Sequence, residues 1–368
     1  MSKIRVLIVD DAVVIRRIVS DVLSADPDIE VVGTAANGKI GLAKIPQVNP
    51  DLVTLDVEMP EMDGIETVRE IRKKYPKLPV VMFSTLTARG AEATLDALSA
   101  GASDYVTKPA NVGSVAVAMA RIREELIPKI RSLCNKAHVE RPQAADAPKA
   151  VRAAPFKPRV PAATGASHPK IVVIGVSTGG PNALAEVIPA LPAGLPVPVL
   201  IVQHMPPVFT RLLAERLQSR SALKVKEAAE GDEICAGTVY IAPGDYHMAV
   251  GNELSGRRIH LNRDTPENSC RPAVDVLFRS VAARYGAGTL AVVMTGMGQD
   301  GLRGAESVRE AGGEVLAQDE ATSVVWGMPG FVARAGLASE LIPLSMIAQQ
   351  ISERVMSRPA VQRLQPVR

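Results

Sequence analysis

The chain has 368 residues, of which 47% are hydrophobic and 22% charged, and its formal net charge at pH 7 is +3. Such a composition is typical of globular protein, and the length predicts about two domains. The weak charge forms no basic patch with interleaved aromatics, so we expect no nucleic-acid partner. No apolar run reaches the roughly 18 residues of a membrane span, so we expect a cytoplasmic protein without direct membrane insertion.

The three cysteines, Cys134, Cys235 and Cys270, lie far apart in the chain and show no metal-ligand spacing. We therefore interpret them as ordinary thiols in a reducing compartment.

Acidic residues follow two apolar strands in the first third of the chain. Ile4–Val9 leads into Asp10 and Asp11, and a strand over residues 51–55 leads into Asp56. The carboxyl ends of parallel strands meet at one sheet edge, where crowded carboxylates repel one another unless a hard cation such as Mg²⁺ lies among them. Any one of these residues alone is also a common helix cap or turn residue.

Two further strands bring other polar groups to that edge. Pro79–Phe83 is followed by Ser84, and Asp104–Thr107 by Lys108, a hydroxyl and an ammonium that can hold phosphoryl oxygens. Helical patterns alternate with the strands, over Val13–Ala25, Gly38–Gln47, Ile65–Lys74, Ala91–Ala100 and Gly113–Ile127. The alternation predicts a doubly wound, five-stranded parallel sheet over residues 1–124.

The segments Asp10-Asp11, Leu55–Gly64, Ser84 and Ala100–Pro109 together resemble the response-regulator receiver domain. The resemblance implies that Asp56 is the phosphoacceptor and a sensor histidine kinase its phosphodonor. It also implies that Asp10, Asp11, Asp56 and the Glu58 backbone bind Mg²⁺ and that Lys108 pairs with the phosphate. Ser84 would be the switch hydroxyl, and Tyr105 the aromatic residue that moves with it. Phosphorylation of a carboxylate adds charge and can switch a bistable surface.

Residues 136–168 are rich in Ala, Pro, Lys and Arg, a composition that cannot bury enough apolar surface to fold, so we expect a linker over residues 125–168. Helical spacing over Val115–Leu133 indicates that the last receiver helix can continue into it. For His138 and His168, within or beside this segment, we expect no catalytic role.

The second half of the chain opens on four aliphatic residues, Ile171–Ile174, followed by Gly, Ser and Thr and then by Pro181. This order predicts a tight strand-to-helix turn that places Ser177 at a sheet edge beside a helix amino terminus. Such a turn suits an anion, a phosphate or a reacting carbonyl. Glycine-rich turns are also common structural features, and this spacing fits neither a dinucleotide nor a Walker motif.

Two more strands of this half end in polar residues. Val197–Val202 leads to His204, and Thr289–Thr295 leads to a glycine-rich turn that contains Asp300. A serine, a histidine and an acid at three strand ends supply a nucleophile, a general base and an orienting carboxylate. Taken singly, a histidine at a strand end and an aspartate that caps a helix are ordinary structural features.

The chain order of these three residues is Ser, His, Asp, which differs from the order in α/β-hydrolases. Gly175–Gly179 fits the short nucleophile pattern of those enzymes, but the different order favours a different fold.

A β-rich segment lies between these strands. Thr238–Ala242, His247–Val250 and Arg257–Leu261 predict a hairpin at the margin of the sheet, in which His260 is structural and His247 a weaker candidate for the pocket wall. Asp275, in the first turn of a helix that opens at Pro272, is an alternative acid, although such residues usually serve the helix dipole.

The second half resembles the chemotaxis protein-glutamate methylesterase family, CheB, over nearly its whole length. The resemblance rests on Ile174–Pro181, Gln203–Met205, Ala242–His247, Pro272–Phe278 and Met294–Gly301. It implies a mainly parallel α/β esterase domain with a hairpin insertion over residues 169–357, and a tail over residues 358–368. Ala273 stands where the family more often has Ser, and we assign it no catalytic role.

By this resemblance Ser177 is the nucleophile, His204 the base and acid, and Asp300 the orienting carboxylate. Met297 supplies a backbone oxyanion donor, Thr178 steadies the histidine or the hole, and the esterase site needs no cofactor. The implied substrates are glutamate methyl esters and glutamines on the cytoplasmic helices of chemoreceptors, with an unphosphorylated receiver restricting access. The alternatives are a response regulator with a binding output, such as a DNA-binding transcription factor, and a nucleotide-binding domain that uses the turn at Ser177.

Overall fold

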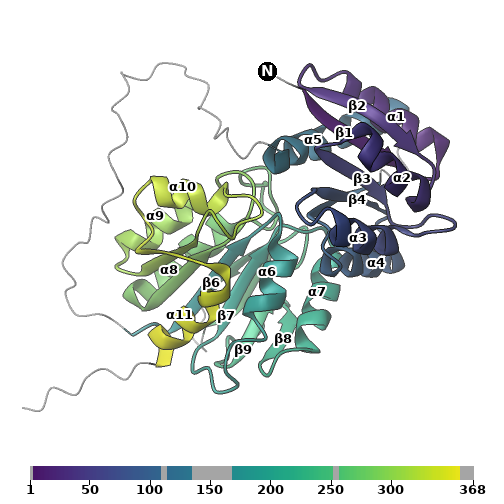
Figure 1. Cartoon of the computed structure of the whole chain (residues 1–368). Coiled ribbons are helices and arrows are strands. Elements are labelled where there is room, and N and C mark those ends of the chain that lie inside the picture. Colours follow the sequence, from purple (N-terminus) through teal and green to yellow (C-terminus); the bar gives the residue numbers. More distant parts are fainter. Residues whose placement is uncertain (1–2, 109–113, 135–167, 252–256, 357–368) are drawn as a thin grey trace, which may run out of the picture. The chain divides into compact units, whose positions relative to one another are not determined.

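The computed structural model describes residues 3–108, 114–134, 168–251 and 257–356. The chain forms two compact units, and each unit contains a large parallel sheet of its own (Figure 1). His138, most of the expected linker and the expected tail lie outside the described residues.

The amino-terminal unit is a five-stranded parallel sheet with the order β2-β1-β3-β4-β5, accompanied by five helices. Its strands are β1 (Ile4–Val9), β2 (Ile29–Ala35), β3 (Leu52–Asp56), β4 (Val80–Ser84) and β5 (Asp104–Thr107). Its helices are α1 (Val13–Ser24), α2 (Gly38–Val48), α3 (Gly64–Lys74), α4 (Ala88–Ser99) and α5 (Val115–Cys134). The expected doubly wound parallel sheet is confirmed, and its order reverses between β1 and β3, where such folds bind ligands.

Local sequence explains how these helices begin. The side chains of Asn37, Asp63 and Thr87 accept hydrogen bonds from backbone N–H groups in the first turns of α2, α3 and α4. An N-cap of this kind satisfies a donor that the helix itself leaves unpaired. The strands β3 and β4 are buried along their whole lengths, as is typical of strands in a parallel sheet that is covered on both faces.

Helix α5 continues past residue 124, where we expected the receiver module to end, and reaches Cys134. Leu126 and Ile130 in this extension are fully buried, and the helix packs against α1. Arg131 is 3.0 Å from Asp26 and 3.1 Å from Asp28, just after α1. Ten residues of the expected linker are therefore part of the last helix of the amino-terminal unit.

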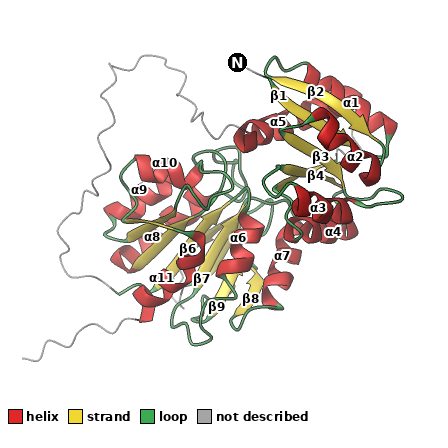
Figure 2. Ribbon diagram, in the orientation of Figure 1, coloured by secondary structure: helices red, strands yellow, loops and turns green. Residues whose placement is uncertain are grey.

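The carboxyl-terminal unit contains a seven-stranded parallel sheet with the order β14-β13-β12-β6-β7-β9-β8. Figure 2 shows its strands in yellow, with β6, β7, β8 and β9 labelled. Its strands are β6 (Ile171–Val176), β7 (Val199–Gln203), β8 (Lys224–Glu227), β9 (Thr238–Ile241), β12 (Thr289–Val293), β13 (Glu314–Gln318) and β14 (Glu340–Ile342). The helices are α6 (Gly180–Val187), α7 (Phe209–Gln218), α8 (Val274–Tyr285), the 3₁₀ turn η1 (Gly286–Gly288), α9 (Leu302–Glu310), α10 (Met328–Arg334) and α11 (Leu344–Met356).

The predicted hairpin is the antiparallel pair β10 (His247–Val250) and β11 (Ile259–Asn262), which forms a separate two-stranded sheet. The segment before it, β9, does not join this hairpin but pairs in parallel with β7 and β8. Every residue of β9 is buried, as expected for a strand inside a covered sheet. The expected mainly parallel α/β domain with a hairpin insertion is thus confirmed.

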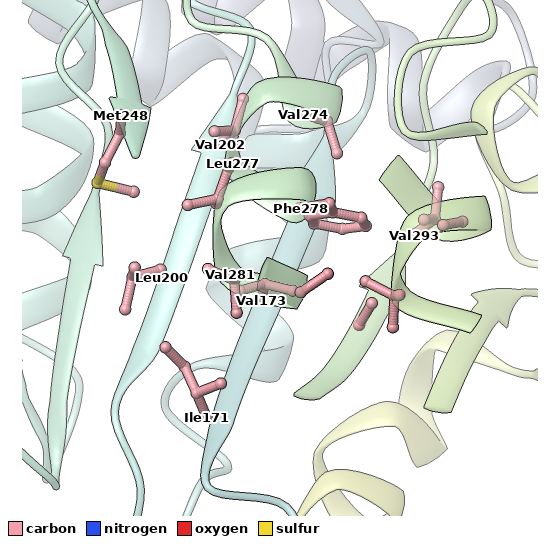
Figure 3. Close-up of a cluster of buried hydrophobic side chains, with 14 of the residues drawn as sticks. Ile171, Val173, Leu200, Val202, Met248, Val274, Leu277, Phe278, Val281 and Val293 are labelled. Atoms are coloured by element: carbon pink, nitrogen blue, oxygen red, sulfur yellow. The ribbon is translucent and has the colours of Figure 1, made fainter. Parts of the chain in front are cut away.

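Helix α8 packs against β6, β12 and the hairpin strand β10, and its buried side chains form the centre of the core (Figure 3). Leu277, Phe278 and Val281 of the helix belong to one buried cluster with Val173 of β6 and Leu200 of β7.

The amino terminus of α8 comes very close to the end of β6. A Cβ atom on Gly175 would lie 2.3 Å from Cγ1 of Val274, a distance that real carbon atoms do not adopt. The absence of a side chain at residue 175 therefore allows the first turn of α8 to reach the edge where Ser177 lies.

Replacing Gly175 with Ala should destabilise the carboxyl-terminal unit by about 1–3 kcal/mol, because the added methyl group overpacks the contact with Val274. Urea unfolding followed by the fluorescence of Trp326, the single tryptophan of the chain, reports on this unit alone. Gly194→Ala is the matched control, since a Cβ there meets nothing within 4 Å. Equal midpoints for the two variants would contradict the packing argument.

Candidate functional sites

The first candidate site is a carboxylate cluster at the ends of β1 and β3, made of Asp10, Asp11 and Asp56. Their oxygens lie within 4.8 Å of one another. The Lys108 ammonium, just after β5, is 2.7 Å from Asp56 and 3.0 Å from Asp10. Burial and the nearby Asp10 raise the pKa of Asp56 to about 6, against the lowering effect of Lys108. When all three carboxylates are ionised, their negative charge exceeds the single positive charge of Lys108.

The donor set of this cluster suits a hard divalent cation. Besides the three carboxylates, the Glu58 carbonyl accepts no hydrogen bond from any residue that the structure describes. The Glu58 side chain instead lies 3.4 Å from Arg89, with both groups largely exposed. Oxygen ligands of this kind, carboxylates and a free carbonyl, are those that Mg²⁺ prefers.

Ser84 and Tyr105, the expected switch residues, lie on the neighbouring strands β4 and β5. The Ser84 hydroxyl lies 3.0 Å from the carbonyl oxygen of Gly90 and accepts a hydrogen bond from the Thr94 hydroxyl, both on α4. Tyr105 is buried, which raises the pKa of its phenol well above the ordinary value. The Ser84 hydroxyl is thus bonded to α4, and the switch roles remain predictions.

The second candidate site lies at the carboxyl edge of the seven-stranded sheet, where β6, β7 and β12 are neighbours. The Ser177 N–H donates to the carbonyl of Thr295 at 3.0 Å, and the His204 N–H donates to that of Val176 at 3.2 Å. A Cβ atom on Gly296 would lie 2.8 Å from Cβ of Ser177, so the loop after β12 passes directly against the serine. Ser177, His204 and the loop to Asp300 therefore leave the sheet side by side.

His204 and Asp300 are in direct contact, with 2.8 Å between Nε2 of the ring and Oδ2 of the carboxylate. Asp300 is only 2% exposed, yet both of its oxygens accept backbone N–H bonds, from Val274, Asp275 and Gly301. These donors stabilise the ionised carboxylate.

The proton affinities of this pair follow from the contact. Burial disfavours the imidazolium, but the Asp300 hydrogen bond and the adjacent Cys270 outweigh it and raise the pKa of His204 above its ordinary value. Burial likewise disfavours the Asp300 anion, but the His204 hydrogen bond outweighs this and lowers its pKa. The imidazole is therefore more basic than an ordinary histidine.

Cys270 is a residue of this site that sequence reasoning missed. Its Sγ lies 3.6 Å from Nδ1 of His204, the ring nitrogen that faces away from Asp300. Within the described residues, the Ser177 hydroxyl makes no hydrogen bond to His204. The structure thus joins His204 to Asp300 and Cys270, with Ser177 on the adjacent strand end.

Asn268 is a second residue that the sequence did not reveal. Its amide group donates to Asp275 at 2.9 Å and to Asp300 at 3.0 Å, and so links the two acids. Asp275 also accepts N–H bonds from Gly301 and Gly304, and burial, more than any neighbour, raises its pKa to about 6. Asp275 therefore holds the turn that carries Asp300, and the acid hydrogen-bonded to His204 is Asp300.

The other described histidines have structural surroundings. His247 is 1% exposed, and its two ring nitrogens face the Thr265 carbonyl and the Ala273 N–H. His260 is exposed and lies 3.1 Å from Glu230. His168 contacts the Val355 carbonyl at 2.7 Å.

Met297 and Thr178, the two residues that we expected at an oxyanion hole, both lie in loops beside Ser177. The Met297 N–H donates to no acceptor among the residues that the structure describes, and the residue is half-buried. Thr178 follows Ser177 directly, at the turn before α6. An unpaired N–H beside a candidate nucleophile is the arrangement that an oxyanion requires, although its role here remains a prediction.

Comparisons with known proteins match both units. A CheB methylesterase family model matches residues 172–351, and a response regulator receiver domain model matches residues 6–120. Protein-glutamate methylesterase/protein-glutamine glutaminase of Trichodesmium erythraeum is 54% identical over 96% of this chain and 100% of its own length. That of Nocardioides sp. is 56% identical over 98% of each chain. The CheB methylesterase catalytic domain of Thermotoga maritima, a crystal structure, has a TM-score of 0.50 and 46% identity, covering 51% of this chain and 99% of that one.

The fold and the comparisons together define a class of protein, a response regulator whose receiver domain is joined to an α/β output domain. Within that class the chain belongs to the CheB methylesterase family. Among the helices that the structure describes, none is both long and apolar enough to cross a membrane.

Asp300→Asn should lower the pKa of His204, because a neutral amide no longer stabilises the imidazolium. Loss of an adjacent charge changes a pKa by about 1–3 units. NMR titration of the imidazole, assigned by comparison with His204→Gln, measures the change. Asp264→Asn, at an exposed position in the loop after β11, is the matched control. An unchanged titration of His204 in Asp300→Asn would contradict the ion-pair assignment.

Proposed function

We propose that this protein is a phosphorylation-activated protein-glutamate methylesterase and protein-glutamine glutaminase that acts on chemoreceptors in the cytoplasm and serves adaptation in chemotaxis. The supporting observation is the buried His204–Asp300 pair, which lies on the strand end next to Ser177. Full-length similarity to relatives with these two activities in their names supports the same assignment.

The hydrolysis uses Ser177 as nucleophile and His204 as base and acid. The Ser177 hydroxyl transfers its proton to Nδ1 of His204 while its oxygen attacks the side-chain carbonyl of the substrate. His204 then passes the proton to the departing methoxide, which leaves as methanol, or to the amine of a glutamine, which leaves as ammonia. Water hydrolyses the acyl-enzyme by the same base, and the free acid is released.

The neighbouring groups stabilise this sequence of steps. Asp300 fixes the ring through Nε2 and stabilises the imidazolium as it forms. The Met297 N–H, which has no acceptor among the described residues, is available to the oxyanion, a contribution typically worth about 10²–10³ in rate. Thr178 supports the histidine or the oxyanion hole from the turn after Ser177.

The receiver controls the esterase through Asp56. A sensor histidine kinase supplies the phosphoryl group, the Asp56 carboxylate attacks it, and the Lys108 ammonium pairs with the phosphate. Asp10, Asp11, Asp56 and the Glu58 carbonyl would hold Mg²⁺, which when bound would supply positive charge beside the phosphoryl group. Ser84 is the switch hydroxyl and Tyr105 the aromatic that moves with it. Release of Ser84 from its α4 partners is then part of the switch.

Two alternatives are less well supported. A DNA-binding output would present a basic recognition helix, whereas this unit is a seven-stranded sheet. Cys270, the thiol in contact with His204, is an alternative nucleophile. Ser177 is favoured over it because Ser177 lies at the strand-to-helix turn, against the loop that carries the Met297 N–H.

Ser177→Ala should reduce the kcat for methanol release from methylated receptors by about 10⁴-fold or more, because the nucleophile is lost. Ser219→Ala, at the exposed end of α7, is the matched control. Methanol release at the control rate by Ser177→Ala would overturn the assignment of the nucleophile.

Asp56→Asn should abolish the rise in esterase rate that a small phosphodonor and Mg²⁺ produce in the unaltered chain. A coupling of about 1–3 kcal/mol corresponds to a rise of about 5- to 150-fold. Asp21→Asn, exposed on α1, should respond like the unaltered chain. Equal stimulation of the Asp56 variant would contradict the proposed phosphoacceptor.

A further inference from the structure

The ring nitrogen of His204 that does not contact Asp300, Nδ1, faces the sulfur atom of Cys270. Asp300 lies at Nε2, 2.8 Å away, and so favours the tautomer whose proton is on that nitrogen. The lone pair then remains on Nδ1, and its partner at 3.6 Å is Sγ of Cys270. The nitrogen that must accept a proton during hydrolysis is thus paired with a thiol.

A tight turn holds Cys270 in this position. Glu267 and Cys270 exchange backbone hydrogen bonds of 3.1 and 2.9 Å, and the two residues between them, Asn268 and Ser269, both have positive φ. Left-handed geometry at both central residues is that of a type I′ turn. Arg279 of α8 anchors Glu267 through two contacts of 2.7 and 2.6 Å. The sulfur therefore belongs to an anchored loop.

The separation of the sulfur and nitrogen atoms matches a pair of zinc ligands. Zinc binds sulfur at about 2.3 Å and histidine nitrogen at about 2.0–2.1 Å, and a tetrahedral angle between them puts the two ligand atoms roughly 3.5 Å apart. The observed Sγ–Nδ1 distance is 3.6 Å. A cation can therefore enter between them with little movement of either side chain.

Asp300 contacts the other ring nitrogen of His204, Nε2, and so fixes the orientation of the ring. Its oxygens already accept bonds from three backbone N–H groups, Asn268 and His204. A carboxylate that is saturated in this way orients the ring rather than binding the cation, as in the carboxylate–histidine–zinc arrangement of many metal sites. Water or the substrate would supply the remaining ligands.

We propose that Cys270 and His204 form a binding site for a soft divalent cation of the Zn²⁺ type, and that its occupancy inhibits the esterase. Thiolate and imidazole select such cations, whereas the all-oxygen carboxylate cluster of the receiver selects hard ones. Binding releases to solvent the thiol proton of Cys270 and, where the ring is an imidazolium, the proton on Nδ1, and the cation then occupies Nδ1. His204 can then no longer accept the proton of Ser177, a consequence that rests on the proposed function.

Cobalt tests the site directly and without reference to activity. Co²⁺ replaces Zn²⁺ in such sites, and a thiolate ligand gives a near-ultraviolet charge-transfer band that carboxylates do not. We expect the full-length protein to show this band on titration with Co²⁺, and Cys270→Ala and Cys270→Ser to lose it. Cys235→Ser, whose thiol is exposed elsewhere, should keep it. Trp326 fluorescence during urea unfolding confirms that each variant is folded.

The inhibitory effect is tested separately with Zn²⁺ and methanol release, each variant being normalised to its own zinc-free rate. The Zn²⁺ concentration for half-inhibition should rise at least about 10-fold in Cys270→Ser, the lower end of the effect of disturbing a metal site, and stay unchanged in Cys235→Ser. A cobalt band in folded Cys270→Ala, no band in the unaltered chain, or equal inhibition of all variants would overturn the proposal. A band that depends on Cys270 in a protein without methanol release would instead refute the proposed function alone.

Discussion

The contact between His204 and Asp300 is the interaction on which the carboxyl-terminal site depends. It brings together side chains 96 positions apart and places a buried charge against an imidazole at 2.8 Å. A lone buried carboxylate would be costly, but backbone N–H groups from the start of α8 and from Gly301 compensate for its desolvation. Their approach depends in turn on Gly175, because any side chain there would hold α8 away. The close packing of α8 against Gly175 therefore also fixes the position of the Asp300 carboxylate.

The two units present contrasting chemistry at equivalent places, the carboxyl edges of parallel sheets. In the receiver, three carboxylates face a single ammonium, and the pKa of Asp56 is raised first by burial and then by repulsion from its acidic neighbours. In the carboxyl-terminal unit, the Asp300 carboxylate accepts several hydrogen bonds, and the His204 imidazole and the Cys270 thiol lie beside it, with Ser177 on the adjacent strand end. The first set suits hard cations and phosphoryl transfer, and the second suits proton transfer, acyl transfer and soft cations.

Much of the architecture could be predicted from local pattern. The strands at Ile4–Val9 and Asp104–Thr107 were predicted with the bounds that the structure has, because a charged residue, Asp10 or Lys108, directly follows each of them. The predicted end of the last receiver helix was less accurate. Helical spacing indicated a continuation, but only packing against α1 shows that it is an integral part of the receiver. Likewise β9 was predicted as part of a hairpin with the strands that follow it, whereas it pairs in parallel with β7 and β8, which precede it in the chain.

The sequence by itself determined that polar residues end several buried strands, and parallel pairing then requires those ends to meet at one edge. That placed Asp10 with Asp56, and Ser177 near His204 and Asp300. Only the tertiary structure decided which atoms touch: that Asp275 supports the turn at Gly301, that Ser84 bonds to α4, and that Cys270 faces Nδ1 of His204. The physical reason is that strand ends follow from backbone periodicity. The direction of a side chain on a loop, such as the turn at Asn268 and Ser269, follows from anchors elsewhere in the chain that no local pattern records.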